Sequence, residues 1–208
     1  MTGVNRLGIL GGTFDPPHNG HIRAALVAAQ ELGLDRVLLI PTNIPPHKQA
    51  GSNKASACQR LDMTRLAING HENLAVDGRE IARGGKSFTI LTVFELKDEY
   101  KNAEIWFICG TDMFLTVQNW HRAQELLNEV AFAVVPRAAG DLEKLSKHKL
   151  FLEEKYGAKV KIIACQPLDI SSSAIRQKDA SALVPQGVYD YIEKNGLYLP
   201  TEKGCNFR

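Results

Sequence analysis

The sequence has little of what marks several specialised classes of protein. Its 208 residues include only 4 cysteines, 3 methionines and 2 tryptophans. The cysteines lie far apart and form no C-x-x-C pair, which argues against a zinc site and against a disulfide framework. A reducing, cytoplasmic location suits them better; they are Cys58, Cys109, Cys165 and Cys205.

Long hydrophobic runs and an excess of charge of one sign are also missing. No apolar run approaches the length of a membrane-spanning helix, and the first residues do not resemble a signal peptide. The formal net charge is +2, which provides no electrostatic case for a nucleic-acid or membrane partner. The hydrophobic fraction of 44% and the charged fraction of 23% are ordinary for a globular protein. We expect a single domain over residues 1–199 and a flexible tail over 200–208.

Short apolar runs alternate with segments of helical periodicity. Buried strands are predicted at 4–10, 36–41, 73–76, 105–109, 130–135 and 160–164. Helices are predicted at 18–33, 56–70, 87–100, 120–127, 141–156, 172–178 and 186–195, the second of them opened by a capping box from Ser56 to Gln59. This alternation predicts a Rossmann-like α/β fold, a doubly wound parallel sheet with helices on both faces and a small C-terminal helical part.

The turn after the first strand carries the strongest chemical signal. Ligands of open α/β sheets bind at the carboxyl ends of the strands, and Gly11 and Gly12 let the backbone approach a ligand closely. His18 and His21 are three residues apart at a helix start, so they share one face beside amides that favour anions. We expect both imidazoles to lie at an exposed helix end and to contact a phosphate; the alternative is two solvated histidines.

Two other nucleotide-binding patterns fit poorly. The G-x-G-x-x-G turn of dinucleotide oxidoreductases is absent, and no acidic residue ends the strand at 36–41. The run Gly85-Lys86-Ser87 looks like the end of a P-loop, but position 80, which should be glycine, is Glu80. A P-loop kinase or ATPase and a nucleotide-binding module without catalysis remain as alternatives.

Two motifs together resemble the nucleotidyltransferase superfamily. Residues 18–21 match its H-x-G-H signature, and residues 170–176, Ile-Ser-Ser-Ser-Ala-Ile-Arg, match its I-S-S-[ST]-x-[IV]-R motif. Within the superfamily the chain is most similar to bacterial nicotinate mononucleotide adenylyltransferases, over nearly its whole length. Segments at 45–48, 83–89, 110–112 with Trp120, and 135–137 support this resemblance. Pro17 and Ser173 depart from the commonest residues without removing a functional group.

The resemblance implies a reaction and a set of residues. The adenylyl group of ATP passes to nicotinate mononucleotide by direct attack, giving deamido-NAD and pyrophosphate in NAD biosynthesis. The implied catalytic residues are His18, His21 and Arg176. The implied ATP-binding residues are Gly11, Gly12, Thr13, Phe14, His18, His21, Gly110, Asp112, Ile170, Ser171, Ser172, Ser173 and Arg176. The implied mononucleotide-binding residues are Lys48, Thr89, Trp120 and Arg137.

Structural alternatives remain for four of these residues. Asp112 could cap a helix, Trp120 could belong to the core, Lys48 could be solvated in its loop, and Arg137 could form a surface ion pair. The resemblance implies Mg²⁺ carried by the ATP phosphates, with no metal ligand from the protein. The sequence does not indicate an oligomeric state.

Overall fold

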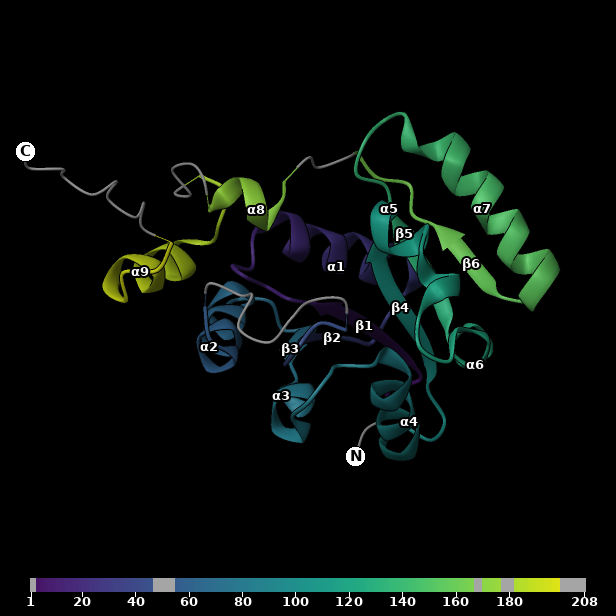
Figure 1. Ribbon diagram of the computed structural model, residues 1–208, viewed down its shortest axis with the longest axis horizontal. Helices are drawn as coiled ribbons and strands as arrows, with labels where there is room; N and C mark the ends of the chain where they lie inside the picture. The colour runs from purple at the N-terminus through teal and green to yellow at the C-terminus, as the bar shows by residue number, and fades with distance from the viewer. Residues whose placement is uncertain (1–2, 47–54, 167–169, 177–181, 199–208) are drawn as a thin grey trace, which may run out of the picture.

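The computed structural model describes residues 3–46, 55–166, 170–176 and 182–198 and contains one six-stranded sheet (Figure 1). All strand pairs are parallel, and the order across the sheet is β3-β2-β1-β4-β5-β6. The chain reverses direction across the sheet between β1 and β4, which is where doubly wound sheets bind ligands. The strands are β1 (Arg6–Gly12), β2 (Arg36–Pro41), β3 (Leu74–Val76), β4 (Glu104–Gly110), β5 (Ala131–Val135) and β6 (Lys159–Ile162).

Helices cover both faces of the sheet. One face packs against α1 (Asn19–Leu32), α2 (Ala57–Ala67) and α9 (Gln186–Lys194). The other packs against α4 (Thr89–Glu99), α6 (Ala123–Glu129) and α7 (Asp141–Tyr156). The remaining helices are short: α3 (Arg79–Arg83), α5 (Thr111–Phe114), the 3-10 helix η1 (Val117–Asn119) and α8 (Ser172–Ile175). The predicted Rossmann-like fold is confirmed.

Alternation along the strands produces these two layers. Successive side chains of a strand point to opposite faces of the sheet. Leu10 and Ile108 therefore join the core beneath α1, whereas their neighbours Ile9 and Phe107 join the core beneath α4. Because both faces are covered, the central strands are continuous apolar runs, and this is the signal that predicted them.

Local signals define several helix ends. Gly33 has the left-handed backbone that ends α1, with φ of 60°. The predicted capping box of α2 is confirmed, because the Gln59 amide donates to Ser56 Oγ at 3.2 Å and the Ser56 amide donates to Gln59 Oε1 at 2.9 Å.

Several predicted boundaries are wrong by one to three residues, and three of them lie near the carboxyl end of the sheet. Gly11 and Gly12 pair with Ile40 and Pro41, so they end β1 and the turn begins at Thr13. The helix predicted from 87 begins at Thr89. The helix predicted from Trp120 begins at Ala123, because Arg122 adopts a left-handed conformation with φ of 53°. Residues 177 and 178 of a further predicted helix, and the expected tail at 200–208, lie outside the described residues.

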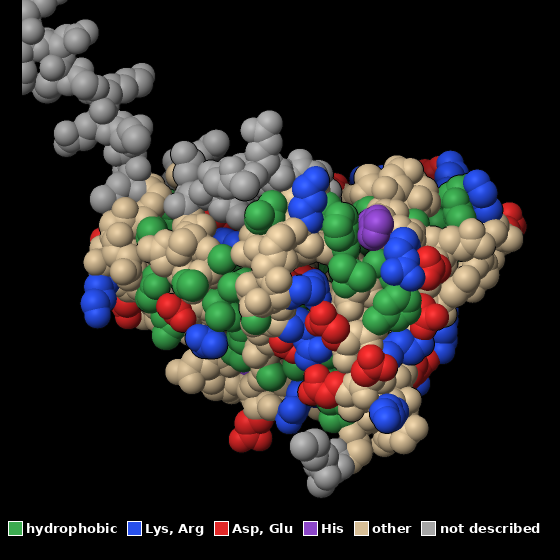
Figure 2. All heavy atoms as spheres, turned by 60° about the horizontal axis from the view of Figure 1, so that its bottom comes forward, with side chains coloured by type: hydrophobic (Ala, Val, Ile, Leu, Met, Phe, Trp, Pro, Cys, Tyr) green, Lys and Arg blue, Asp and Glu red, His purple; other side chains and the backbone are tan. Residues whose placement is uncertain are grey.

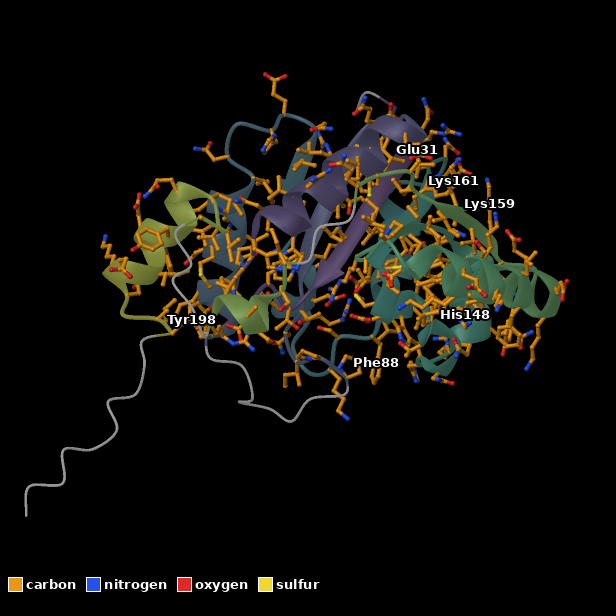
Figure 3. All side chains as sticks on the ribbon, turned by 90° about the horizontal axis from the view of Figure 1, so that it is seen from above. Glu31, Phe88, His148, Lys159, Lys161 and Tyr198 are labelled. Atoms are coloured by element: carbon orange, nitrogen blue, oxygen red, sulfur yellow. The ribbon has the colours of Figure 1, made fainter. Side chains whose placement is uncertain are left out.

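The chain leaving β6 is tied to α1 before it reaches α8. Glu31 of α1 and Lys161 of β6 lie side by side with N–O separation of 3.2 Å (Figure 3). The other Glu31 oxygen accepts a hydrogen bond from the Ala164 amide at 2.8 Å. These bonds fix the direction in which the chain returns to the carboxyl end of the sheet.

The surface carries mixed charges. On the side of α3 and α4, acidic and basic side chains are interspersed without a large area of one sign (Figure 2). None of the described helices combines the length and the apolar character that a membrane crossing requires.

Candidate active site

Two adjoining cavities open at the carboxyl ends of β1 and β4. The smaller has a volume of about 300 Å³ and reaches from the start of α1 to α8. The larger has a volume of about 650 Å³ and reaches from the start of α4 to the segment after η1. Both are lined by Gly11, Gly12, Thr13 and Met113, so the end of β1 forms a wall between them.

Distant segments hold the turn between β1 and α1. Phe14 is buried and has a left-handed backbone, with φ of 50°. Arg176 Nη1 donates to the Asp15 carbonyl at 2.6 Å. Asp15 Oδ1 accepts from the Tyr198 hydroxyl at 2.7 Å and from the Ala55 amide at 3.1 Å. Residues from three separate parts of the chain therefore determine the shape of this turn.

The two histidines lie on the same side of the helix start, as their spacing predicted, and their rings stack on each other. Their ring centroids are 3.6 Å apart, with 24° between the ring planes. The His18 amide donates to His21 Nδ1 at 3.2 Å, which in the neutral ring places the His21 proton on Nε2. Gly20 is needed here, because a Cβ at this position would lie 3.0 Å from His18 Nδ1.

The expectation that both rings are exposed is wrong, because His18 is only 3% exposed and His21 is half-buried. The His21 ring stacks on the His18 ring, and the edge of the His18 ring lies against Gly20. Burial and, to a smaller extent, the positive charge of Arg137 lower the pKa of His18 to about 4. Burial also lowers the pKa of His21 well below its ordinary value, and the positive charges of His18 and Arg137 contribute to a smaller extent. Both rings are thus neutral hydrogen-bond donors near pH 7.

The second motif meets the first at α8. Ser171 caps the helix, accepting from the Ala174 amide at 3.2 Å. Ser172 Oγ donates to the Pro16 carbonyl at 2.9 Å, and Arg176 Nη2 donates to Ser173 Oγ at 3.2 Å. Of the residues expected at ATP, all except Asp112 line the smaller cavity: Gly11, Gly12, Thr13, Phe14, His18, His21, Gly110, Ile170, Ser171, Ser172, Ser173 and Arg176.

Asp112 was expected to bind ATP and Arg137 to bind the mononucleotide, but neither lines the same cavity as the other residues expected at its ligand. Asp112 lines the larger cavity and Arg137 the smaller one, and Arg137 Nη1 lies 2.9 Å from Asp112 Oδ2. Gly110 leaves room for this arrangement, because a Cβ there would lie 3.0 Å from Arg137 Nε. Asp141 was not predicted from the sequence as a site residue. Its Oδ2 accepts hydrogen bonds from the Arg137 and Ala138 amides at 3.0 Å each.

Aromatic rings line the larger cavity together with the start of α4. Thr89 is the first residue of that helix, and Trp120 lies across from it and packs edge-on against Phe107 at 5.7 Å. Phe88 and His121 also line the cavity, with ring centroids 4.3 Å apart. The sequence analysis missed His121; its position directly after Trp120 is the signal that could have found it. Lys48 lies outside the described residues.

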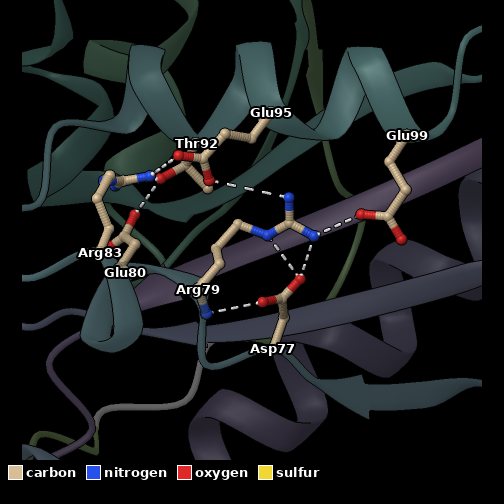
Figure 4. Close-up of polar contacts among 7 residues, drawn as sticks. All are labelled: Asp77, Arg79, Glu80, Arg83, Thr92, Glu95 and Glu99. Carbon is tan, nitrogen blue, oxygen red and sulfur yellow. Dashed lines mark hydrogen bonds and ion pairs between the residues drawn. The ribbon is translucent and has the colours of Figure 1, made fainter.

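A polar network that reaches the lining of this cavity through Glu80 and Thr92 joins α3 to α4 (Figure 4). Glu80 is buried, and its Oε1 accepts from Thr92 Oγ1 at 2.6 Å. Arg83 donates to the same hydroxyl at 3.0 Å and to Glu95 at 2.7 Å. Arg79 pairs with Asp77 at 2.6 Å and with Glu99 at 2.8 Å. The residue that rules out a P-loop is therefore a structural carboxyl group, whose pKa burial raises.

Comparison with known proteins places this geometry in a family. The family model described as cytidylyltransferase-like matches residues 9–178. A protein of Carboxydothermus hydrogenoformans named probable nicotinate-nucleotide adenylyltransferase is 37% identical over 198 residues, which cover 93% of this chain and 98% of that protein. The nicotinate-nucleotide adenylyltransferase of Bacillus subtilis is 34% identical over 200 residues, covering 94% and 99%.

A solved structure agrees in fold. The Plasmodium falciparum nicotinic acid mononucleotide adenylyltransferase complexed with NaAD has a TM-score of 0.72 to this chain, covering 93% of this chain and 97% of that one at 19% identity. The family match over residues 9–178 includes both motifs that line the smaller cavity. This chain belongs to the nicotinate-nucleotide adenylyltransferase family of nucleotidyltransferases.

Proposed function

We propose that this protein transfers the adenylyl group of ATP to nicotinate mononucleotide, producing deamido-NAD and pyrophosphate in NAD biosynthesis. The observation that carries the proposal is the pair of cavities that meet at Gly11, Gly12 and Thr13. ATP occupies the smaller cavity, where hydroxyls, imidazoles and Arg176 surround its phosphates. The mononucleotide occupies the larger one, with its pyridine ring among Trp120, Phe88 and the start of α4.

In this arrangement the two phosphates meet at the wall between the cavities. An oxygen of the mononucleotide phosphate attacks the α-phosphorus of ATP, and the bond from that phosphorus to the bridging oxygen of the β-phosphate breaks. Pyrophosphate leaves with the electron pair. Because the attacking group is already an anion, no protein nucleophile or strong base is required.

The chain contributes hydrogen bonds and charge at the transferring group. His21 Nε2, which carries the ring proton, and the neutral His18 donate to the α-phosphate oxygens. Arg176 is held by the Asp15 carbonyl and Ser173, and its guanidinium stabilises the outgoing pyrophosphate. The amides at the start of α8 and the serine hydroxyls bind the remaining phosphate oxygens.

The donor groups of the smaller cavity suit phosphate oxygens better than a cation. Among the described residues, no three His, Cys, Asp or Glu side chains gather in a way that would hold a metal ion. We therefore propose that Mg²⁺ enters on the ATP phosphates, where it neutralises their charge.

A substrate panel with product masses tests this function. Purified protein is incubated with ATP and Mg²⁺, with and without nicotinate mononucleotide. We expect pyrophosphate and deamido-NAD only when both substrates are present. ADP as the product would instead indicate a kinase or an ATPase, and ATP binding without turnover would indicate a module that lacks catalysis.

A further inference from the structure

Arg60 is a fully buried cation that the chemistry above does not use. It lies in α2, on the face that packs beneath the sheet, and is 1% exposed. Nη1 donates to the Thr13 carbonyl at 2.7 Å, and Nη2 donates to the Asn43 carbonyl at 3.1 Å. One guanidinium group therefore joins the segment after β1 to the segment after β2.

The connection continues to a third segment. The Asn43 amide donates to Ser87 Oγ at 2.9 Å, and Asn43 Nδ2 donates to the Gly85 carbonyl at 3.0 Å. Ser87 in turn donates from its amide to the Ile44 carbonyl at 2.9 Å, and the Thr42 amide donates to the Gly12 carbonyl at 2.9 Å. Hydrogen bonds thus run without a break from the wall between the cavities to the loop that leads into α4.

Stability alone does not explain a guanidinium at this position. Burying a cation is costly even where a carboxylate such as that of Asp15 interacts with it, and apolar side chains often replace buried charge pairs without loss of stability. Arg60 Nε has no hydrogen-bond partner within the described part of the chain, which adds to this cost. What the planar fork provides is a pair of donors with fixed spacing, aimed at two separate backbone carbonyls.

We propose that Arg60 is a positioning residue for adenylyl transfer, holding the walls of the two cavities in register so that the two phosphates meet in line. This inference rests on the proposed function. Thr13 belongs to both cavities, whereas Ser87 belongs to the larger one. Arg60 itself lines neither, so it acts through the backbone that it holds.

The kinetic test separates alignment from binding. Arg60→Met should reduce kcat by about 10²-fold, the loss that a misplacement of about 1 Å causes, whereas KM for each substrate should change by less than about threefold. Arg60→Lys keeps the charge without the planar fork, and its kcat should stay at least about tenfold below that of the wild type. Arg65→Met is the matched control, since Arg65 lies on the same helix and makes an exposed pair with Asp62 at 3.2 Å.

A double-mutant cycle tests the connection itself. Ser87→Ala removes the acceptor at the far end of the chain of bonds. If both residues act through Asn43, the double variant should have a kcat within about threefold of that of Arg60→Met alone. Losses that multiply would overturn the shared connection. A folded Arg60→Met enzyme with normal kcat, a loss confined to one KM, or full recovery in Arg60→Lys would overturn the positioning role.

Hydrogen exchange provides a readout that does not depend on activity. In Arg60→Met, the amides of Thr42, Asn43 and Ser87 should exchange at least about tenfold faster, whereas the amides of β4 and β5 should not change. Unchanged exchange at the three loop amides would refute the inference even if the wild-type protein failed to transfer adenylyl groups. Failure of the wild type in the substrate panel would refute the proposed function only.

Discussion

Arg137 Nη1 lies 2.9 Å from Asp112 Oδ2, and this bond joins side chains that line different cavities. Their side chains are 44% and 75% exposed, so the pair adds less than about 1 kcal/mol to the free energy of unfolding. A substrate phosphate can therefore replace Asp112 as the partner of Arg137 at little cost.

Substitutions at this pair should change substrate binding without changing stability. The family resemblance assigns Arg137 to the mononucleotide and Asp112 to ATP, although each side chain lines the cavity proposed for the other ligand. On that assignment, Arg137→Met should raise KM for nicotinate mononucleotide by about tenfold, and Asp112→Ala should raise KM for ATP by a similar factor. Steady-state kinetics and thermal melts check both, with Lys147→Met, from an exposed pair of α7, as the control. An Arg137→Met enzyme impaired only in KM for ATP would assign Arg137 to ATP.

Loss of either histidine should reduce turnover. His18→Ala and His21→Ala should each lower kcat by roughly 10²–10³-fold, the scale for removing one donor to a transition state. His18 is buried, so its variant should also melt at a lower temperature. The control is His71→Ala, which should leave kcat unchanged because His71 precedes β3 at the amino end of the strands, opposite the end that carries His18. Wild-type turnover in folded His18→Ala would contradict the assigned role.

The buried His18 should make the fold sensitive to acid. Its pKa is about 4 in the folded protein, beside Arg137 and His21, and 6.5 when unfolded. As the pH falls from 6.5 to 4, the unfolded state gains a proton that the folded state excludes. The free energy of unfolding should then fall by about 1.4 kcal/mol per pH unit from this group. Urea unfolding at several pH values should show a shallower decline for His18→Gln; parallel declines would argue against it.

Arg176 should be sensitive even to a change that keeps its charge. It donates to the Asp15 carbonyl at 2.6 Å and to Ser173 Oγ at 3.2 Å, contacts that a lysine cannot reproduce together with a phosphate contact. We expect Arg176→Lys to lower kcat/KM for ATP by at least about tenfold. Initial rates over a range of ATP concentrations measure this, and unchanged kcat and KM would exclude the role.

The start of α4 should distinguish an acid from an amide on the pyridine ring. Its amides can donate to both carboxylate oxygens, whereas an amide group presents an NH₂ to one of them. Nicotinate mononucleotide should therefore be preferred over its amide by at least about 10²-fold in kcat/KM, equivalent to about 2.7 kcal/mol. Competition kinetics test this preference, and equal use of the two compounds would reject this assignment of the larger cavity.

The proposed stacking of Trp120 on the pyridine ring can be followed by tryptophan fluorescence. Trp106 and Trp120 are the two tryptophans, and only Trp120 lines the larger cavity. Nicotinate mononucleotide should quench the fluorescence of a Trp106→Phe variant but not that of Trp120→Phe. Trp120→Ala should weaken binding of the acid and the amide alike, since both rings stack in the same way.

The sequence predicted the sheet because its buried strands are local apolar runs, whereas the meeting of the two motifs was implied by the family resemblance. The strand at 36–41 and the helix at 141–156 have the bounds of β2 and α7, since each is set by a clear apolar run or by capping residues. The short helices α3 and α5 were missed, because one turn is too short for periodicity.

What the sequence could not predict depends on tertiary contacts. The burial of His18 follows from stacking by His21 and contact with Gly20. The pairing of Arg137 with Asp112 requires β4 and β5 to be neighbours. The role of Arg60 depends on two carbonyls that lie 47 and 17 residues away along the chain.

The wall shared by the two cavities also makes them reachable by one long molecule. Gly11, Gly12, Thr13 and Met113 line both cavities, so the two cavities share a boundary at the end of β1. A compound that joins an adenosine to a pyridine carboxylate through a short anionic spacer would lose its translational freedom once, where two separate ligands lose it twice. For inhibitor design, a single compound that spans this shared boundary would address both cavities at once.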